Sequence, residues 1–270
     1  MNISIKIYKL IYILIFLSCT GMDNKYPWYQ DSYEIARSIA GNKLIMLDFY
    51  AQWWGGCVRL DAETFSNKSI INNAENYISI KVDLDDPKNE TLANQFNISS
   101  IPQNIFVNSK GIEIDRIIGF LEPMEFSNRV NNILKNVNTV SDFENRLSND
   151  TNNIEILSLL GEKYEIMSKY DNALDIYKRI INLKPEKNII IKTNFNIAKI
   201  EMHNGNPETL INFINSYPDF SQNSIGYRLL SRYYKSIENS EKEIEILNQW
   251  VISCSDDPDV LNAYAWRMSE

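Results

Sequence analysis

The sequence predicts an α/β domain followed by an all-α domain. Apolar runs of strand length alternate with helical patterns up to about residue 140, and this alternation is typical of an α/β fold. Beyond that point every segment has helical periodicity. The chain has 270 residues, of which 44% are hydrophobic and 23% are charged, so it is long and apolar enough for two globular domains.

Four strands and four helices are expected in the first domain. A buried strand interrupted by one acid is predicted over 44–50, and Pro123 is well placed to begin a closing helix. The expected order is α-β-α-β-α-β-β-α. The remaining helices are expected at 28–40, 57–65 and 90–96, with further strands at 77–83, 103–107 and 113–118.

Residues 47–57 read LDFYAQWWGGC and resemble the thioredoxin active-site segment, in which a strand ends in Asp-Phe-x-Ala-x-Trp-Cys-Gly-x-Cys. The run continues to Ser66 and looks most like the periplasmic thioredoxin-like domains of bacterial thiol:disulfide interchange proteins. Further matches follow in order at Lys81-Val82-Asp83, Ile101-Pro102, Gly111 and Gly119. The resemblance covers residues 28–137 and implies a thioredoxin-like fold.

The resemblance also implies roles for individual residues. Asp48 matches the acid that assists proton transfer at the second cysteine of the motif, and Lys81 matches the lysine near that acid. Pro102 matches the cis-proline that shapes the substrate-binding face. We therefore expect Cys57, Asp48 and Lys81 as the catalytic group, and a substrate-binding surface formed by Trp53, Trp54, Ile101 and Pro102.

The first cysteine of the motif is absent, because Trp54 stands at its position. In a Cys-x-x-Cys motif the first thiol lies at a helix N-terminus, where the helix dipole favours the thiolate that attacks a disulfide. An indole has no thiolate, so two-electron dithiol exchange by this motif is lost. Cys57 remains, but the resemblance implies that this second cysteine is the more buried one, and burial raises the pKa of a thiol.

Three interpretations of Trp54 remain open. The tryptophan is a specialisation that keeps the groove as a binding surface, the mark of an inactivated copy, or a single-base change of a cysteine codon. In each case Asp48, Lys81 and Pro102 indicate that the rest of the site is intact.

The N-terminus resembles an export signal. Lys6 and Lys9 precede an apolar run over 10–17, which is too short to span a bilayer. Ser18-Cys19 follows and resembles a bacterial lipoprotein box, although an ordinary secretory signal with an unrelated cysteine is the alternative. We expect a signal peptide over 1–18, a tether over 19–27, lipidation of Cys19 and a location at a membrane of the cell envelope or periplasm.

The helical half, residues 138–270, resembles tetratricopeptide repeats (TPRs). The match is carried by Leu160-Gly161, Tyr164, Ala173, Tyr177 and Pro185, whose spacing fits the 34-residue period. Weaker units are expected over 189–220 and 224–254, with a half unit over 258–268. Stacked repeats form a superhelix with a surface that binds peptides or proteins.

Composition excludes several functions. The net charge of −8 argues against nucleic acid as a partner, and the single histidine, His203, excludes a multi-histidine metal site. Three widely spaced cysteines do not form a disulfide framework, and we expect no metal or cofactor. Two hypotheses remain: a thiol–disulfide protein of the cell envelope, and a non-catalytic adaptor that binds protein partners through the thioredoxin groove and the TPR surface.

Overall fold

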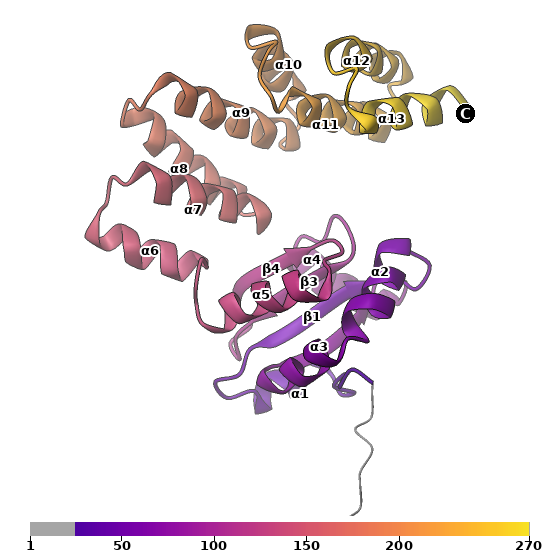
Figure 1. Ribbon diagram of the computed structural model, residues 1–270, viewed down its shortest axis with the longest axis vertical. Coiled ribbons are helices and arrows are strands. Elements are labelled where there is room, and N and C mark those ends of the chain that lie inside the picture. The colour runs from indigo at the N-terminus through magenta and orange to yellow at the C-terminus, as the bar shows by residue number, and fades with distance from the viewer. Residues whose placement is uncertain (1–24, 270) are drawn as a thin grey trace, which may run out of the picture.

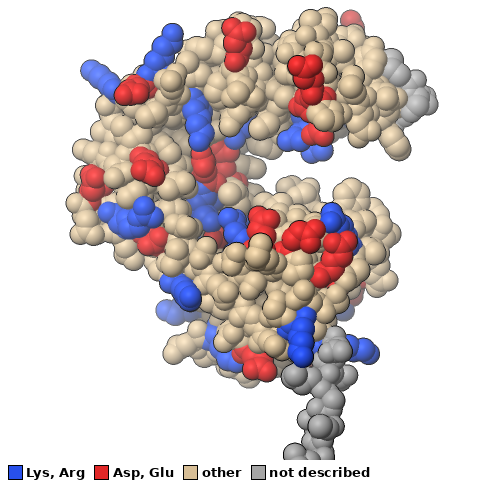
Figure 2. All heavy atoms as spheres, in the orientation of Figure 1, with Lys and Arg blue, Asp and Glu red and all other residues tan. Residues whose placement is uncertain are grey.

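The computed structural model describes residues 25–269 and consists of a sheet-containing part followed by an arc of helices (Figure 1). The predicted signal peptide and the predicted lipidation at Cys19 lie outside the described residues. Between Lys25 and Ser269, no helix combines the length and the apolar character needed to cross a bilayer. Figure 2 shows the surface hollowed between the helical arc and the sheet-containing part, with acidic and basic side chains on the inner wall.

A four-stranded sheet in the order β2-β1-β3-β4 organises the first part. The central strand β1 (Ile45–Tyr50) pairs in parallel with β2 (Ile78–Asp83) and antiparallel with β3 (Gln103–Val107), which in turn pairs antiparallel with β4 (Glu113–Ile118). All four strands were predicted from the sequence. Every side chain of β1 except Tyr50 is buried, as expected for a strand covered on both faces.

Helices cover both faces of the sheet and form two cores. One core joins Met46 and Phe106 to the π-helical segment Leu60–Phe65, which continues α2 (Gly55–Arg59), and to α3 (Lys68–Asn73) and α5 (Pro123–Leu134). The other core joins the alternate side chains of β1 and β3 to α1 (Tyr33–Ile39) and α4 (Glu90–Gln95). Short 3-10 turns occupy Ala74–Asn76 and Pro87–Asn89.

Two expectations about helices were wrong. The first helix begins at Tyr33 rather than at 28, because Ser32 caps it and Trp28 packs edge-on against Phe65 with ring centroids 4.9 Å apart. Trp28 is therefore a packing residue outside the helix, and its place in the sequence only happened to match the helical spacing of apolar residues. The short helix α3 was not predicted, and it begins where the Asn67 side chain accepts a hydrogen bond from the Ser69 amide.

The helical part continues without strands to the end of the described chain. One helix precedes three antiparallel pairs and one follows them, and the turn at Gly205, with φ of +88°, separates the helices of the second pair. This pairing is what the repeat prediction expects, although the assignment to TPRs stays a prediction. The helices are α6 (Val140–Asn149), α7 (Ile154–Ile166), α8 (Tyr170–Asn182), α9 (Lys187–His203), α10 (Pro207–Ser216), α11 (Asn223–Ser236), α12 (Ser240–Ser253) and α13 (Pro258–Ser269).

Candidate functional site

The modified motif lies where β1 ends and α2 begins. Trp54 is the residue immediately before α2, with extended backbone angles, and its carbonyl accepts hydrogen bonds from the amides of Cys57 and Val58 at 2.9 and 3.0 Å. Its side chain is 46% exposed and that of Trp53 is 69% exposed. The two indoles meet edge to face at 5.9 Å, and Trp53 Nε1 donates to Asp85 at 2.9 Å. An exposed aromatic pair therefore occupies the helix N-terminus where the attacking thiol of a complete motif would lie.

Cys57 lies within the first turn of α2 and is only 3% exposed. Burial raises the pKa of its thiol, and the nearby carboxylates of Asp48 and Asp61 raise it further. The residue borders a shallow depression together with Tyr50 and Asp61. Cys57 and Cys254 are both free thiols. The remaining cysteine of the motif is therefore kept in the thiol form at neutral pH.

Asp48 lies at the centre of the sheet and is 1% exposed. The strand register places Lys81 of β2 and Asn104 of β3 on either side of it. Asn104 Nδ2 donates to Asp48 Oδ1 at 2.7 Å, and Lys81 Nζ lies 3.5 Å from Asp48 Oδ2. Burial raises the pKa of Asp48 to about 7, against the lowering effect of Lys81 and Asn104. The carboxyl group can therefore gain or lose a proton near neutral pH.

Lys81 joins this buried acid to the surface. Its ammonium contacts both oxygens of Asp61 at 2.6 and 2.7 Å, and it lies 4.2 Å from the centre of the Tyr50 ring. Asp61 is supplied by the π-helical segment that follows α2. The ammonium thus bridges one buried and one exposed carboxylate, so the sequence prediction that pairs Asp48 with Lys81 agrees with the geometry.

The loop before β3, which contains Ile101 and Pro102, lies beside the motif. The Ile101–Pro102 peptide bond is cis, as the resemblance implied. A Cβ at Gly56 would lie 3.2 Å from Pro102 Cδ and 3.2 Å from Trp54 Nε1, so the glycine allows both side chains to approach. Pro102 is buried and Ile101 is half-buried. The structure therefore brings Trp54, Gly56 and Pro102 together.

Two residues of the site, Asp61 and Asn104, were not identified from the sequence. Asp61 follows Cys57 by four residues, so helical spacing could have indicated that it lies near the motif. Asn104 is a polar residue in a fully buried strand, and that pattern was the available signal for a partner of Asp48. Between Lys25 and Ser269, no cluster of three or more His, Cys, Asp or Glu side chains is arranged to hold a metal ion.

Comparisons with known proteins show which proteins the first part of the chain is similar to. The sequence model of the thioredoxin-like domain family matches residues 32–134. The thiol:disulfide interchange protein DsbD of Haemophilus influenzae (strain PittGG) is 28% identical over 116 residues, which are 41% of this chain and 20% of that protein. DsbD of Campylobacter jejuni (strain RM1221) is 37% identical over 99 residues, which are 36% of this chain and 17% of that protein.

Among solved structures, one described as DsbH oxidoreductase aligns with a TM-score of 0.37 and 20% identity, covering 44% of this chain and 92% of its own. The chain spans no more than about a fifth of the length of the two DsbD proteins it matches. Residues 32–134 are therefore a thioredoxin-like domain, similar to the thioredoxin-like domains of DsbD.

Proposed function

We propose that this chain is an exported, lipid-anchored thioredoxin-like protein of the thiol–disulfide interchange type in which dithiol exchange is lost. The observation that carries the proposal is Trp54 at the N-terminus of α2, where the nucleophilic thiol of a complete motif would be. Without that thiol no mixed disulfide forms at the helix end, and no second cysteine can resolve one.

Exchange through Cys57 alone is the remaining redox route, and its environment disfavours it. The nucleophile in disulfide exchange is the thiolate, and burial together with two neighbouring carboxylates raises the pKa of this thiol. At 3% exposure its sulfur is also poorly accessible to a protein disulfide. We therefore assign Cys57 no exchange activity in the native chain.

The exposed tryptophans of the motif support binding. Trp53 and Trp54 expose large aromatic surfaces, Trp54 lies near Pro102 across Gly56, and tryptophans of this kind contribute strongly to protein interfaces. The surrounding groups of a redox site, Asp48 and Lys81, are present. The second candidate function is therefore a non-catalytic adaptor of the cell envelope that binds protein partners through this groove and through the helical arc.

The proposed envelope location is supported by the sequence of the N-terminus. The charged residues, the apolar run and Cys19 at the N-terminus support export and lipidation. Mass spectrometry of the mature protein, purified from membranes, would show a lipid on an N-terminal Cys19. A mature N-terminus beyond residue 19 would exclude the anchor.

Insulin-disulfide reduction in the presence of dithiothreitol tests the loss of exchange. We expect no rate above the dithiothreitol background for the native chain and a clear gain for Trp54→Cys. The matched control is Trp54→Cys combined with Cys57→Ser, in which the introduced thiol has no resolving partner and turnover should fall again. Equal activity of the native chain and Trp54→Cys would refute this reading of the motif.

Binding of carboxymethylated insulin B chain, an unfolded polypeptide without free thiols, tests the groove. Quenching or shift of tryptophan fluorescence should report binding by the native chain, and Trp53→Ala and Trp54→Ala should each weaken it. Ile39→Ala, which changes an exposed residue of α1 outside both proposed binding surfaces, is the control. Equal affinity of all four proteins would exclude the groove as the binding surface.

A further inference from the structure

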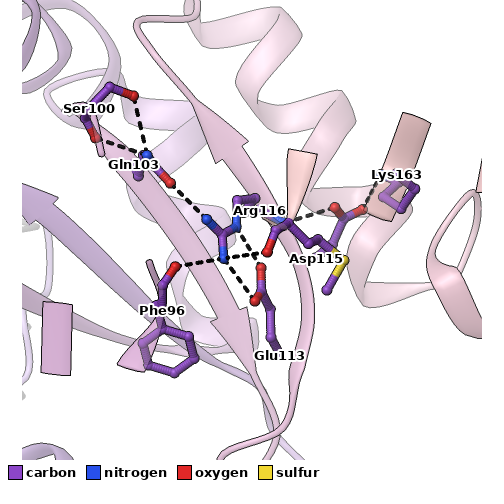
Figure 3. Close-up of polar contacts among 8 residues, drawn as sticks. Phe96, Ser100, Gln103, Glu113, Asp115, Arg116 and Lys163 are labelled. Carbon is purple, nitrogen blue, oxygen red and sulfur yellow. Dashed lines mark hydrogen bonds and ion pairs between the residues drawn. The ribbon is translucent and has the colours of Figure 1, made fainter. Parts of the chain in front are cut away.

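A charge-balanced cluster joins the helical part to the sheet. Lys163 of α7 donates to Asp115 of β4 at 2.7 Å, and Arg116 forms two hydrogen bonds with Glu113 at 2.6 and 2.9 Å (Figure 3). The side chains of all four residues are at most 9% exposed. Two positive and two negative groups thus neutralise each other where water is excluded, which is the condition under which buried charges are tolerated.

Arg116 contacts both parts of the molecule. Its Nη2 donates to the carbonyl of Phe96 at 3.0 Å and to the carbonyl of Met167, directly after α7, at 3.4 Å. Its backbone amide donates to Asp115, the residue that Lys163 holds. Because the guanidinium is planar and its donors are fixed relative to one another, a shift of α7 that moves the guanidinium changes its bonds to Met167 and Phe96 together.

From Arg116 the network reaches the loop that carries the cis-proline. Arg116 Nη1 donates to Gln103 Oε1 at 3.1 Å, and Gln103 is the residue after Pro102. The side-chain amide nitrogen of Gln103, Nε2, donates to the carbonyl of Ser100 at 2.9 Å and to its hydroxyl at 3.2 Å (Figure 3). The side chain of Gln103 therefore connects Arg116 to the carbonyl and hydroxyl of Ser100, the exposed residue that begins the Ser100–Pro102 loop.

We infer that Gln103 and Arg116 are positioning residues for the Ser100–Pro102 loop, and that the helical part sets this loop through Lys163 and the Met167 carbonyl. The inference deepens the proposed function, because it concerns the loop that borders the binding groove. Its consequence is that a partner seated on the helices changes the affinity of the groove when it displaces α7. The polar chain from Lys163 to Ser100 passes through the backbone amide of Arg116, and its side chains are buried except that of Ser100.

Gln103→Met in the full-length chain tests the last link. Methionine fills a similar volume but makes neither the bond from Arg116 nor those to Ser100. We expect the amide signals of Ser100 and Ile101 and the indole signal of Trp54 to shift in nitrogen-15 NMR spectra. Affinity for carboxymethylated insulin B chain should fall about fivefold or more. Unchanged signals in a folded variant would overturn the assignment of Gln103.

Lys163→Met and Lys199→Met form a matched pair for the interdomain link. Each removes a lysine paired with an acid at 2.7 and 2.9 Å, but Lys199 pairs with Glu165 inside the helical part and makes no bond to β4. We expect Lys163→Met to shift the Ser100 and Ile101 signals and Lys199→Met to leave them unchanged. Equal effects of both variants, or none from a folded Lys163→Met, would refute the link.

A charge-balanced variant keeps the test valid if Lys163→Met unfolds. Lys163→Met combined with Asp115→Asn removes both charges of the pair, so no uncompensated charge stays buried, and the loop signals should still shift. The NMR signals do not depend on the B chain. If the native chain fails to bind the B chain, the proposed groove function fails, whereas unshifted loop signals contradict the positioning role alone.

Discussion

Lys81 lies closer to Asp61 than to Asp48, with Nζ 2.6 Å from Asp61 Oδ1 and 3.5 Å from Asp48 Oδ2. The buried Asp48 carboxylate therefore shares the Lys81 ammonium with the exposed Asp61 carboxylate. Desolvation outweighs this shared attraction, and the pKa of Asp48 rises to about 7 from an ordinary value of 3.8. The Asp48 carboxyl therefore changes its protonation near neutral pH, and this titration can be measured in the folded chain.

Replacing Asp48 should change how stability depends on pH. The folded state binds the Asp48 proton more tightly than the unfolded state, so native stability falls as pH rises from about 4 to about 7. Asp48→Asn keeps the shape without the charge, and we expect it to be the more stable protein at pH 8 by on the order of 4 kcal/mol. Urea unfolding at pH 5 and pH 8 measures the difference.

The matched control for this measurement is Asp171→Asn, an exposed aspartate of α8. Its stability should follow that of the native chain at both pH values. If Asp48→Asn shows the same pH dependence as the native chain, the buried carboxyl does not titrate in this range and the proposed proton site is wrong.

Removing Lys81 should move the titration of Asp48 to higher pH. The ammonium is the largest influence that lowers the pKa of Asp48, so Lys81→Met leaves burial and the Asp61 charge without that opposition. Carbon-13 NMR of the Asp48 carboxyl measures the midpoint directly. An unchanged or lower midpoint would show that Lys81 does not stabilise the carboxylate. Lys88→Met, which removes a lysine paired with Asp86, should leave the midpoint in place.

Cys57 should react slowly with iodoacetamide in the native state. Its thiol is buried and its pKa is raised, so both access and thiolate population are low at pH 7. Carrying out the reaction in a variant with both Cys19→Ser and Cys254→Ser leaves Cys57 as the one thiol of the chain. We expect a much faster reaction after unfolding in guanidinium, because unfolding exposes the thiol and removes the burial that raises its pKa. Similar rates in both states would show that Cys57 is accessible.

The fold was predictable where local pattern and tertiary packing agree. The strands at 103–107 and 113–118 were predicted with the bounds observed, because a glycine turn separates two apolar runs. The helix start at Tyr33 and the helix α3 were not, because a distant aromatic contact at Trp28 and a side-chain cap at Asn67 decide them. Neither contact has a signature in the spacing of apolar residues.

The site was predictable only as far as the resemblance reached. Asp48, Lys81 and Pro102 were identified from their motif positions, whereas Asn104 depends on the register of β3 against β1. The cluster of Arg116 and Lys163 depends on how a helix of the second part packs on an edge strand of the first. Such long-range packing leaves no periodic trace in a single sequence.

Gly161 should be intolerant of any side chain, which tests the packing of the first helix pair. A Cβ at this position would lie 2.4 Å from Cε1 of Tyr177. The ring cannot easily withdraw, because its hydroxyl donates to Glu165 at 2.6 Å and accepts from Asn196 at 3.2 Å. Helix propensity alone would favour alanine, so a loss of stability isolates the steric cost.

We expect Gly161→Ala to lower the free energy of unfolding by about 1–3 kcal/mol, the range typical of overpacking. Gly55→Ala is the control, because Gly55 is also helical but a Cβ there meets nothing within 4 Å. That variant should be as stable as the native chain or more so, by up to about 1 kcal/mol. Urea unfolding of both variants, followed by circular dichroism, compares them. A Gly161→Ala chain as stable as Gly55→Ala would mean that α7 and α8 pack less closely than the structure shows.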